Sequence, residues 1–361
     1  PRPAGLRLWL PCRPEALRPR LSAAPTASCS LAAVIPTRLA SLLDSLRPLA
    51  ERFSARDHRL YLVGGSVRDL LLGGDRLPED LDFTTDASPE QIKATLGGWA
   101  DALWTQGERF GTIGAMAAGV TVEITTHRAE VYHPESRKPE VTFSADVVDD
   151  LARRDFTVNA MALEVTGTAP ELIDPFDGAA DLAASRLRTP SGPQVSFGED
   201  PMRMMRAARF SAQLGFEVDA AVVEAMHEQA ERLTIVSAER VREEFMKIVM
   251  SPDPRRGLTL LVDTGLAEYV IPELPLLRLE EDEHHHHKDV YEHTLTVLEQ
   301  AMALETAHAP ASGPDPVLRL AALLHDIGKP RTRRFEPDGR VSFHHHEVVG
   351  ARMTRERMKA L

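Results

Sequence analysis

Two aspartates spaced two residues apart, Asp80 and Asp82, are the side chains of this sequence best placed to do chemistry. The segment that holds them, 80–85, predicts a β-strand. Residues two apart on a strand face the same side, so both carboxylates can point into one site. Hard oxygen ligands held this closely suit Mg²⁺ bridging a nucleoside triphosphate. The pair therefore predicts a magnesium site, although a bare Asp-x-Asp is more often a pair of solvent-facing acids.

A glycine turn upstream of the two aspartates favours the magnesium interpretation. Residues 59–63 predict a short strand that runs into Gly64-Gly65, and a helix is expected from Ser66. Glycines allow the backbone to approach phosphate, and a helix N-terminus supplies N–H groups to it. Arg68 and Asp69 follow, and the Asp-x-Asp pair begins eleven residues after Asp69. This ordered combination is much stronger evidence than either motif alone.

The sequence resembles the nucleotidyltransferase superfamily that contains the CCA-adding enzymes and the bacterial poly(A) polymerases, specifically its bacterial-type class II branch. The resemblance covers the chain from about residue 58 onward. Five motifs in the family's order carry it: LVGGSVRD with DLDFTTDA, RRDFTVNAMA, DPFDG, EDPMRMMRAARFSAQLGF and RVREEFMK. It implies an α+β head with a small mixed sheet and helices (38–175), an all-α neck (176–260) and a helical HD body (261–361).

The resemblance also implies roles for residues of the head. Asp80 and Asp82 are the expected metal ligands and catalytic carboxylates. Glu123 stands where the family often has a third carboxylate near the metals, and a plain exposed strand glutamate explains it equally well. The residues implied to contact the triphosphate and ribose are Gly64, Gly65, Arg68, Arg154 and Asp155.

A polar segment at 129–145 is expected to be a loop. The wider stretch 127–146, with Arg137 inside it, resembles the flexible loop that CCA-adding members carry and CC-only enzymes lack. This resemblance favours the complete CCA activity, although residues 135–138 depart from the usual sequence of that loop.

Asp200 and Arg203 open the next predicted helix and have two readings. Asp200 as N-cap with Pro201 in the first turn is good helix-start chemistry that requires no function. Alternatively, the two side chains share one helical face, where the carboxylate accepts and the guanidinium donates hydrogen bonds. Cytosine and adenine present an amino donor beside a ring-nitrogen acceptor, whereas guanine and uracil present a carbonyl and a ring N–H. The family uses this pair as an amino-acid template for C and A. Arg206 and Arg209 resemble nucleotide-contacting positions, with a solvated helix face as the alternative.

The C-terminal half contains His293, His325-Asp326 and His346 in an order that resembles an HD domain. Imidazoles and an aspartate on facing helices make a plausible divalent transition-metal site. Such a site would hydrolyse phosphomonoesters or phosphodiesters, for example a 2′,3′-cyclic phosphate on damaged tRNA. The family's last ligand aspartate would fall beyond Leu361. The alternative of a degenerate HD domain that serves as an RNA-binding scaffold therefore stays open.

The predicted function is Mg²⁺-dependent, template-independent addition of CMP and AMP, from CTP and ATP, to the 3′ end of tRNA. A poly(A) polymerase, or an enzyme adding only A or only CC, shares nearly every motif. From another class, an HD phosphohydrolase with a nucleotide-sensing head is the alternative, and the intact Asp80/Asp82 pair argues against it.

Composition sets limits on this function. The chain has 361 residues, so two or three domains are expected. Its net charge of −12 requires an RNA-binding enzyme to segregate its positive charge, as in the Arg203–Arg209 series and 329–334. No apolar run is long enough to span a membrane, and no protein partner can be inferred.

The N-terminal segment differs in composition from the rest of the chain. The two cysteines both lie there, at positions 12 and 29, and their scarcity suits a reducing cytoplasm. Residues 1–37 are rich in Arg, Ala, Pro and Ser, which predicts a disordered extension. A transit peptide or a mistranslated upstream stretch has the same composition. The chain begins at Pro1 and stops within a helical pattern, so we expect a fragment.

Overall fold

The computed structural model describes residues 37–73, 80–117, 119–133, 136–144, 146–279, 289–308 and 313–361, all within one compact unit, Ile35–Leu361. The predictions for residues 1–36, including both cysteines, lie outside the described residues, as does the histidine run 284–287. Among the helices of the described ranges, none is long and apolar enough to cross a membrane.

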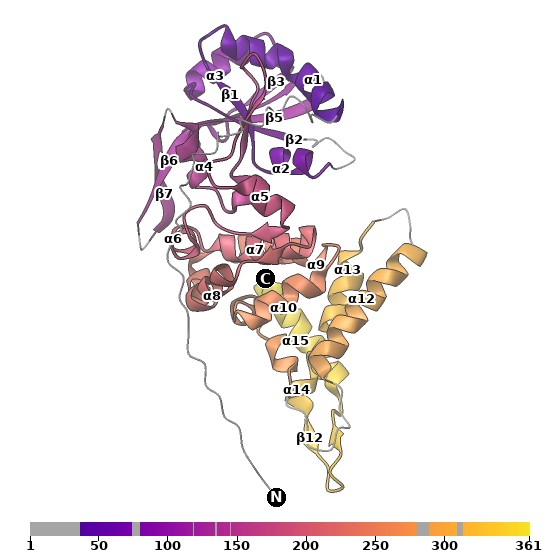
Figure 1. Ribbon diagram of the computed structural model, residues 1–361. Coiled ribbons are helices and arrows are strands. Elements are labelled where there is room, and N and C mark those ends of the chain that lie inside the picture. Colours follow the sequence, from indigo (N-terminus) through magenta and orange to yellow (C-terminus); the bar gives the residue numbers. More distant parts are fainter. Residues whose placement is uncertain are drawn as a thin grey trace, which may run out of the picture. The chain divides into compact units, whose positions relative to one another are not determined.

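The N-terminal half is built on a mixed sheet, several strands of which are labelled in Figure 1. The sheet has seven strands in the order β3-β4-β5-β2-β1-β8-β9. The central β2–β5 pair is parallel and the other neighbouring strands are antiparallel. The strands are β1 (Leu60–Val63), β2 (Asp80–Thr85), β3 (Ala102–Trp104), β4 (Thr112–Ala117), β5 (Val120–Thr126), β8 (Ala162–Glu164) and β9 (Glu171–Ile173).

The two faces of this sheet have different compositions because side chains alternate along each strand. One face carries the buried residues Leu62, Phe83 and Ile124, which belong to the same apolar core as Leu49 and Ile92. Those last two residues come from helices α1 (Thr37–Ser54) and α3 (Pro89–Leu96). The Asp80/Asp82 pair alternates with this apolar set, so it lies on the opposite face of the sheet.

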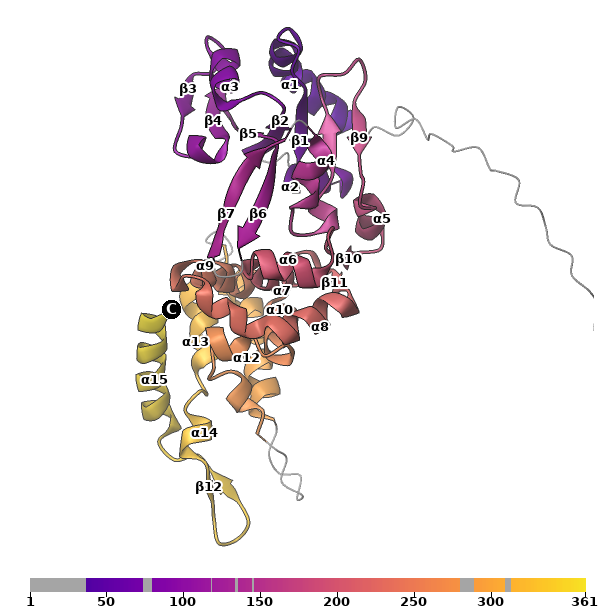
Figure 2. The ribbon, with the colours of Figure 1, turned by 90° about the vertical axis from the view of Figure 1, so that its left-hand side faces the viewer.

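The prediction of a polar loop at 129–145 is wrong. The chain there forms a two-stranded antiparallel hairpin, β6 (Arg128–His133) and β7 (Ser136–Phe143), separate from the main sheet (Figure 2). The expectation failed because the segment lacks a strong apolar alternation, so no local pattern indicates the backbone pairing of the two strands.

The remaining helices of the head connect the strands. Ser88 caps α3 with a capping box in which Ser88 and Gln91 satisfy each other's backbone N–H groups, which sets the start of α3. The short helices are α2 (Gly65–Leu71), η2 (Glu108–Phe110), α4 (Val147–Ala152), η3 (Thr157–Asn159) and α5 (Gly178–Ala183).

The C-terminal half is helical, as predicted, with two small additions. Short strand pairs, β10–β11 and β12–β13, were not predicted because each strand has only two residues. Their bounds are β10 (Arg186–Leu187), β11 (Glu217–Val218), β12 (Arg334–Phe335) and β13 (Val341–Ser342). The helices are α6 (Pro193–Glu199), α7 (Met202–Leu214), α8 (Ala220–Gln229), η4 (Ala230–Ile235), α9 (Ala238–Val249), α10 (Pro254–Asp263), α11 (Ala267–Val270), η5 (Pro275–Leu277), α12 (Val290–His308), α13 (Pro316–Leu324), α14 (Lys329–Thr332) and α15 (His346–Ala360).

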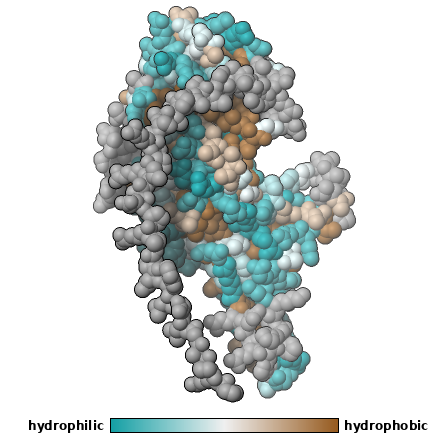
Figure 3. All heavy atoms as spheres, viewed as in Figure 1, coloured by the Kyte–Doolittle hydropathy of each residue, from teal (hydrophilic) through white to brown (hydrophobic). Residues whose placement is uncertain are grey.

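The predicted fold class, an α+β head followed by helices, is therefore confirmed. The face of the molecule drawn in Figure 3 is largely hydrophilic, with hydrophobic areas between the polar ones.

Candidate active site

Three carboxylates lie together on the face of the sheet opposite the α1–α3 core. Asp82 on β2 pairs in parallel register with Glu123 on β5, and Asp80 precedes Asp82 by two residues on the same strand. Burial raises the pKa of Asp82, the charge of Asp80 raises it further, and Arg154 opposes the rise. Burial, Asp82 and Asp80 likewise raise the pKa of Glu123. The acids are therefore close enough to repel one another.

This donor set fits a divalent metal ion. Carboxylate oxygens are the ligands that hard cations such as Mg²⁺ prefer, and a cation between the acids would remove their mutual repulsion. The structure thus favours the third-carboxylate reading of Glu123 over that of an ordinary strand glutamate, because Glu123 lies directly beside Asp82.

The glycine turn after β1 brings the backbone close to a cation. Gly64 has a φ of 70°, which a residue with a side chain rarely adopts. A Cβ atom on Gly64 would also lie only 3.0 Å from Nη1 of Arg154. The neighbouring Arg68 donates to Asn159 over 2.8 Å and pairs with Asp69. Glycine at position 64 therefore serves both the turn and the close approach of Arg154.

Asp150 was missed by the sequence analysis and holds two arginines of the site. Its side chain is fully buried. Oδ1 accepts from Nε and Nη2 of Arg153 at 3.1 and 2.6 Å, and Oδ2 accepts from Nη2 of Arg154 at 3.0 Å. Burial alone would raise the pKa of Asp150, but Arg154 and Arg153 outweigh it and lower the pKa to about 2. The carboxylate is therefore charged and fixes Arg154 beside Gly64.

Arginines of α2 and α7 lie over the ring of Phe210, and Asp155 pairs with one of them. Asp155 accepts from the Phe156 backbone N–H and from Asn159, and it forms an ion pair with Arg206 at 2.6 Å. Burial opposes ionisation, but Arg206 and these hydrogen bonds lower the pKa of Asp155. The guanidinium carbons that lie over Phe210 are those of Arg68, Arg206 and Arg209, at 5.4, 5.7 and 4.2 Å from the ring centroid.

Arg209 is not part of a solvated helix face. Its Nε lies 2.8 Å from Glu244, and its side chain is 14% exposed. Burial lowers the pKa of Arg209. Arg206 is more accessible, at 41%, but it too is paired within the site. The alternative of a solvated helix face therefore fails for both residues.

The two side-chain oxygens of Asp200 have contacts that correspond to its two predicted roles. The predicted N-cap is displaced by one residue, because Pro201 is the N-cap of α7, but Oδ1 of Asp200 still accepts from the Met202 backbone N–H at 3.0 Å. Oδ2 lies 3.8 Å from Nη2 of Arg240, a residue that the sequence analysis did not select. One oxygen therefore holds the start of α7, and the other lies near a guanidinium at the cavity.

Arg203 is buried and held in a fixed position. Its Nη1 donates to the carbonyl and hydroxyl of Ser196 and to Glu199, at 3.2, 2.9 and 3.0 Å. Its Nη2 donates to the backbone carbonyl of Arg153 at 2.5 Å. The last contact ties α7 to the segment that carries Arg153, Arg154 and Asp155. These restraints orient the guanidinium, because few rotamers satisfy all four hydrogen bonds.

Most of the residues predicted for the site line one cavity of about 980 Å³. Among the residues predicted for the head and neck, Asp80 alone is not part of the cavity wall, although it is adjacent to Asp82 on β2. The residues on the wall that the sequence analysis missed are Trp104, Gln106, Gly107, Phe110, Thr112, Gly114, Arg128, Arg153, Asn159, Phe210 and Arg240. Asn159 lies within the RRDFTVNA motif, so the sequence could have indicated it as a site residue. No motif marks Trp104.

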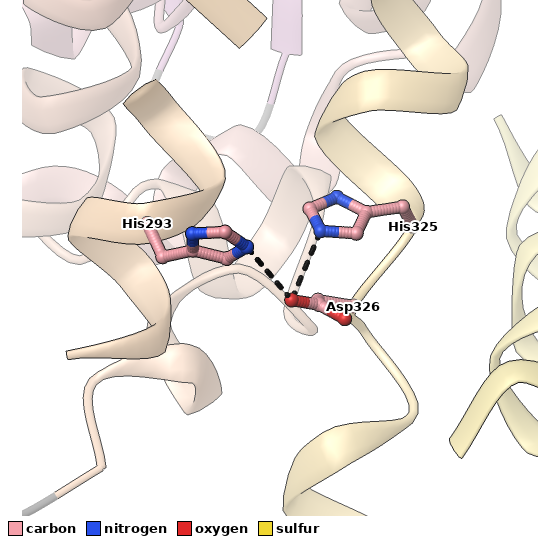
Figure 4. A group of neighbouring side chains, drawn as sticks. All are labelled: His293, His325 and Asp326. Carbon is pink, nitrogen blue, oxygen red and sulfur yellow. Dashed lines mark ion pairs between the residues drawn. The ribbon is translucent and has the colours of Figure 1, made fainter. Parts of the chain in front are cut away.

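A second cluster of titratable groups lies between the C-terminal helices (Figure 4). His293 on α12 and His325 place Nε2 at 3.5 and 2.9 Å from Oδ2 of Asp326. His346 approaches Oδ1 at 3.6 Å. Nitrogen and oxygen atoms of the first three residues all lie within 4.8 Å of one another, which fits a metal site. Lys329 also contacts Asp326, at 2.7 Å, and supplies a positive charge there.

Three family models match the chain, one over the head and two over the helical half. The family model of the "Poly A polymerase head domain" matches residues 60–188, a "Probable RNA and SrmB- binding site of polymerase A" matches 215–277, and an "HD domain" matches 290–361. In its fold and in these three domains the chain resembles the bacterial-type class II CCA-adding tRNA nucleotidyltransferases and poly(A) polymerases. The match to the polymerase head domain implies dependence on a divalent metal ion.

Curated relatives support this placement over part of their length. A CCA-adding enzyme of Lactobacillus helveticus is 38% identical over 234 residues, which are 64% of this chain and 56% of the relative. A CCA-adding enzyme of Latilactobacillus sakei subsp. sakei is 41% identical over 224 residues, 62% of this chain and 54% of the relative. The chain therefore spans about half the length of the curated relatives it matches.

Solved structures show the same fold over a larger share of the chain. The Bacillus stearothermophilus CCA-adding enzyme in complex with CTP has a TM-score of 0.57 at 25% identity, covering 88% of this chain and 82% of that one. A tRNA nucleotidyltransferase complexed with a primer tRNA and an incoming ATP analogue has a TM-score of 0.59 at 25% identity, covering 76% and 74%.

Proposed function

We propose that this protein adds CMP and AMP, from CTP and ATP, to the 3′ end of tRNA without a nucleic-acid template, using Mg²⁺. The observation that carries the proposal is the composition of this cavity, which holds the Asp82/Glu123 carboxylates, a set of arginines and the Asp200/Arg203 pair. The names of the relatives, CCA-adding enzymes, favour CCA addition over poly(A) synthesis. The expected place of action is the cytoplasm.

The carboxylates and the arginines have different roles in the transfer. Asp80, Asp82 and Glu123 would hold the metal, which when bound activates the 3′-hydroxyl and stabilises the leaving pyrophosphate. Arg154, fixed by Asp150, lies beside Gly64 and close enough to Asp82 to lower its pKa, so it is placed to bind the triphosphate. Because these groups are held before the nucleotide arrives, little reorganisation is needed at the moment of reaction.

Selection of the base is assigned to Asp200 and Arg203. Arg203 is held by four hydrogen bonds, so its donors keep one direction in the cavity. The acceptor of Asp200 and the donor of Arg203 match the pairing edges of cytosine and adenine and mismatch those of guanine and uracil. A mismatched base would leave buried polar groups unpaired, at about 1–3 kcal/mol each.

The experiment that tests this function offers the purified protein tRNAs that lack the last one, two or three nucleotides, with each of the four NTPs separately. We expect CMP on the two shorter substrates and AMP only on the tRNA that ends in CC. Runs of A on every substrate would favour a poly(A) polymerase. Addition of A alone, or of CC alone, would identify a partial activity, and no incorporation would contradict the proposal.

Asp150→Asn should weaken nucleotide binding more than it slows the chemical step. The substitution removes the charge that orients Arg153 and Arg154 while keeping the side chain's shape. We expect the KM for CTP to rise about tenfold, the size of one lost charge-assisted contact. Steady-state kinetics with saturating tRNA measures this effect.

Asp181 offers a matched control for Asp150→Asn. It too is a fully buried aspartate that holds two arginines, Arg186 and Arg188, but it is not part of the cavity wall. Asp181→Asn should lower the melting temperature without a selective change in the KM for CTP. An equal change in KM in both variants would show that Asp150 acts through general stability rather than through Arg154.

We propose that the cluster around Asp326 binds a second divalent, transition-metal ion and hydrolyses phosphate esters independently of nucleotide addition. His325→Ala should then abolish metal-dependent hydrolysis of a 2′,3′-cyclic phosphate and leave addition within about twofold, because the two sites share no residue. His344→Ala is the control, since His344 is 73% exposed and contacts Glu336 instead. Absence of hydrolysis in the unmutated protein with transition-metal ions would favour the RNA-binding scaffold.

A further inference from the structure

The two sides of the cavity differ in chemistry, and the sheet order places the carboxylates between them. Asp82, Glu123, Gly114 and Trp104 are successive cross-strand partners on β2, β5, β4 and β3, so they form one row on one face of the sheet. On the other side of β2 lies β1, which ends at the Gly64 turn where Arg154 approaches. The aromatic and cationic sides therefore flank the carboxylates.

Trp104 has a position that only a glycine partner permits. A Cβ atom on Gly114 would lie 1.9 Å from the indole Nε1, so the ring lies directly on the Gly114 backbone. Because Gly114 is the cross-strand partner of Glu123, the indole extends across β4 toward the carboxylates. The side chain is only partly buried and forms part of the cavity wall.

A second aromatic residue and two cations extend this side of the cavity. Phe110 is 44% exposed and lines the cavity. The guanidinium of Arg109 lies over the Phe110 ring, 4.4 Å from its centroid. Arg128 donates to the Phe110 backbone carbonyl at 2.6 Å. Exposed aromatic faces interleaved with cations are the arrangement that binds single-stranded nucleic acid by base stacking and phosphate attraction.

The geometry of nucleotidyl transfer indicates which substrate binds on the aromatic side of the cavity. In an in-line displacement, the attacking oxygen and the leaving group lie on opposite sides of the reacting phosphorus. The leaving pyrophosphate carries most of the nucleotide's negative charge, so it belongs on the side with Arg154. The attacking 3′-hydroxyl must then come from the opposite side, where Trp104 and Phe110 lie.

We propose that Trp104, assisted by Phe110, binds the 3′-terminal nucleotide of the acceptor RNA by stacking on its base, an inference that rests on the proposed nucleotide addition. Stacking tolerates any base, because every base has a π-face. This tolerance suits an acceptor whose terminal base changes with each addition. Asp200 and Arg203 select the incoming nucleotide, and Trp104 binds the 3′ end of the acceptor RNA.

The test compares Trp104→Leu, which keeps apolar bulk without a π-face, with Trp104→Phe, which keeps a ring. Loss of one stacked base corresponds to a factor of about 5 to 150 in affinity. We expect Trp104→Leu to raise the KM for the tRNA acceptor about tenfold with the KM for CTP unchanged, and Trp104→Phe to recover most of the loss. Trp99→Leu is the control, because Trp99 packs against the apolar core and is not part of the cavity wall.

Two kinetic outcomes would overturn the proposal. A rise in the KM for CTP instead of the acceptor would mean that the indole stacks on the incoming base. Equal losses in Trp104→Leu and Trp104→Phe, in step with melting temperature, would mean that Trp104 only packs on Gly114.

Direct binding separates this proposal from the proposed function. The chain has three tryptophans, so Trp104 is the sole indole in a Trp9→Phe/Trp99→Phe variant. An RNA oligonucleotide with a free 3′ end should quench its fluorescence in EDTA without nucleotide, whereas CTP alone should not. Absence of quenching would contradict the stacking subsite even if the protein adds nucleotides. Quenching without incorporation of any NTP would refute the addition activity and leave RNA stacking supported.

Discussion

Replacing Asp82 with asparagine should abolish nucleotide addition while leaving the fold intact. The substitution keeps the size of the side chain but removes one of the clustered charges that would hold the metal. Loss of metal-assisted stabilisation of the transition state costs several kcal/mol, so we expect kcat/KM to fall about 1,000-fold, which corresponds to about 4 kcal/mol. The same loss is expected for Asp80→Asn. Incorporation of labelled CMP in Mg²⁺ measures both variants.

Glu164→Gln is the matched control for these variants. Glu164 also stands on a strand of the sheet, β8, but it contacts Thr166 and Arg59 and is not part of the cavity wall. Its activity should stay within about twofold, and its melting temperature should resemble that of Asp82→Asn. Retention of more than a few per cent of activity in Asp82→Asn would exclude the two-carboxylate assignment.

The part of the site that the sequence predicts is the part that local patterns determine. Asp80 and Asp82 share a face because strand alternation requires it, and the Gly64 turn follows from glycine's freedom at positive φ. In each case the responsible residues lie within a few positions of one another, so sequence reasoning can reach them.

The parts that sequence reasoning missed depend on partners far along the chain. Arg203 is oriented by the carbonyl of Arg153, fifty positions away, and Arg240 approaches Asp200 from α9. Trp104 owes its position to Gly114, across a strand pair, and no local spacing marks either residue. The β6–β7 hairpin was missed for a related reason, since pairing of two polar segments leaves no apolar periodicity.

The structure also sharpens the test of nucleotide choice, because the two oxygens of Asp200 have different neighbours. Oδ1 accepts from the Met202 N–H, and Oδ2 lies near Arg240. Asparagine caps helices as well as aspartate does, so Asp200→Asn keeps the first interaction. It replaces the second oxygen by an NH₂ donor, which repels the amino groups of cytosine and adenine and matches the carbonyls of uracil and guanine.

We therefore expect Asp200→Asn to change base choice without changing stability. The ratio of kcat/KM for CTP to that for UTP should fall about 10- to 100-fold, since each mismatched polar contact is worth about 1–3 kcal/mol. Arg203→Ala should also weaken discrimination, but it removes the tie to Arg153 as well, so its loss of rate is not specific to the base. Asp219→Asn is the control, because Asp219 caps α8 through the Ala221 N–H and is not part of the cavity wall. Measuring all four NTPs on these variants separates the two roles. Unchanged nucleotide ratios in Asp200→Asn would leave Asp200 as a helix cap, and the preference for C and A would then have to come from other residues of the cavity.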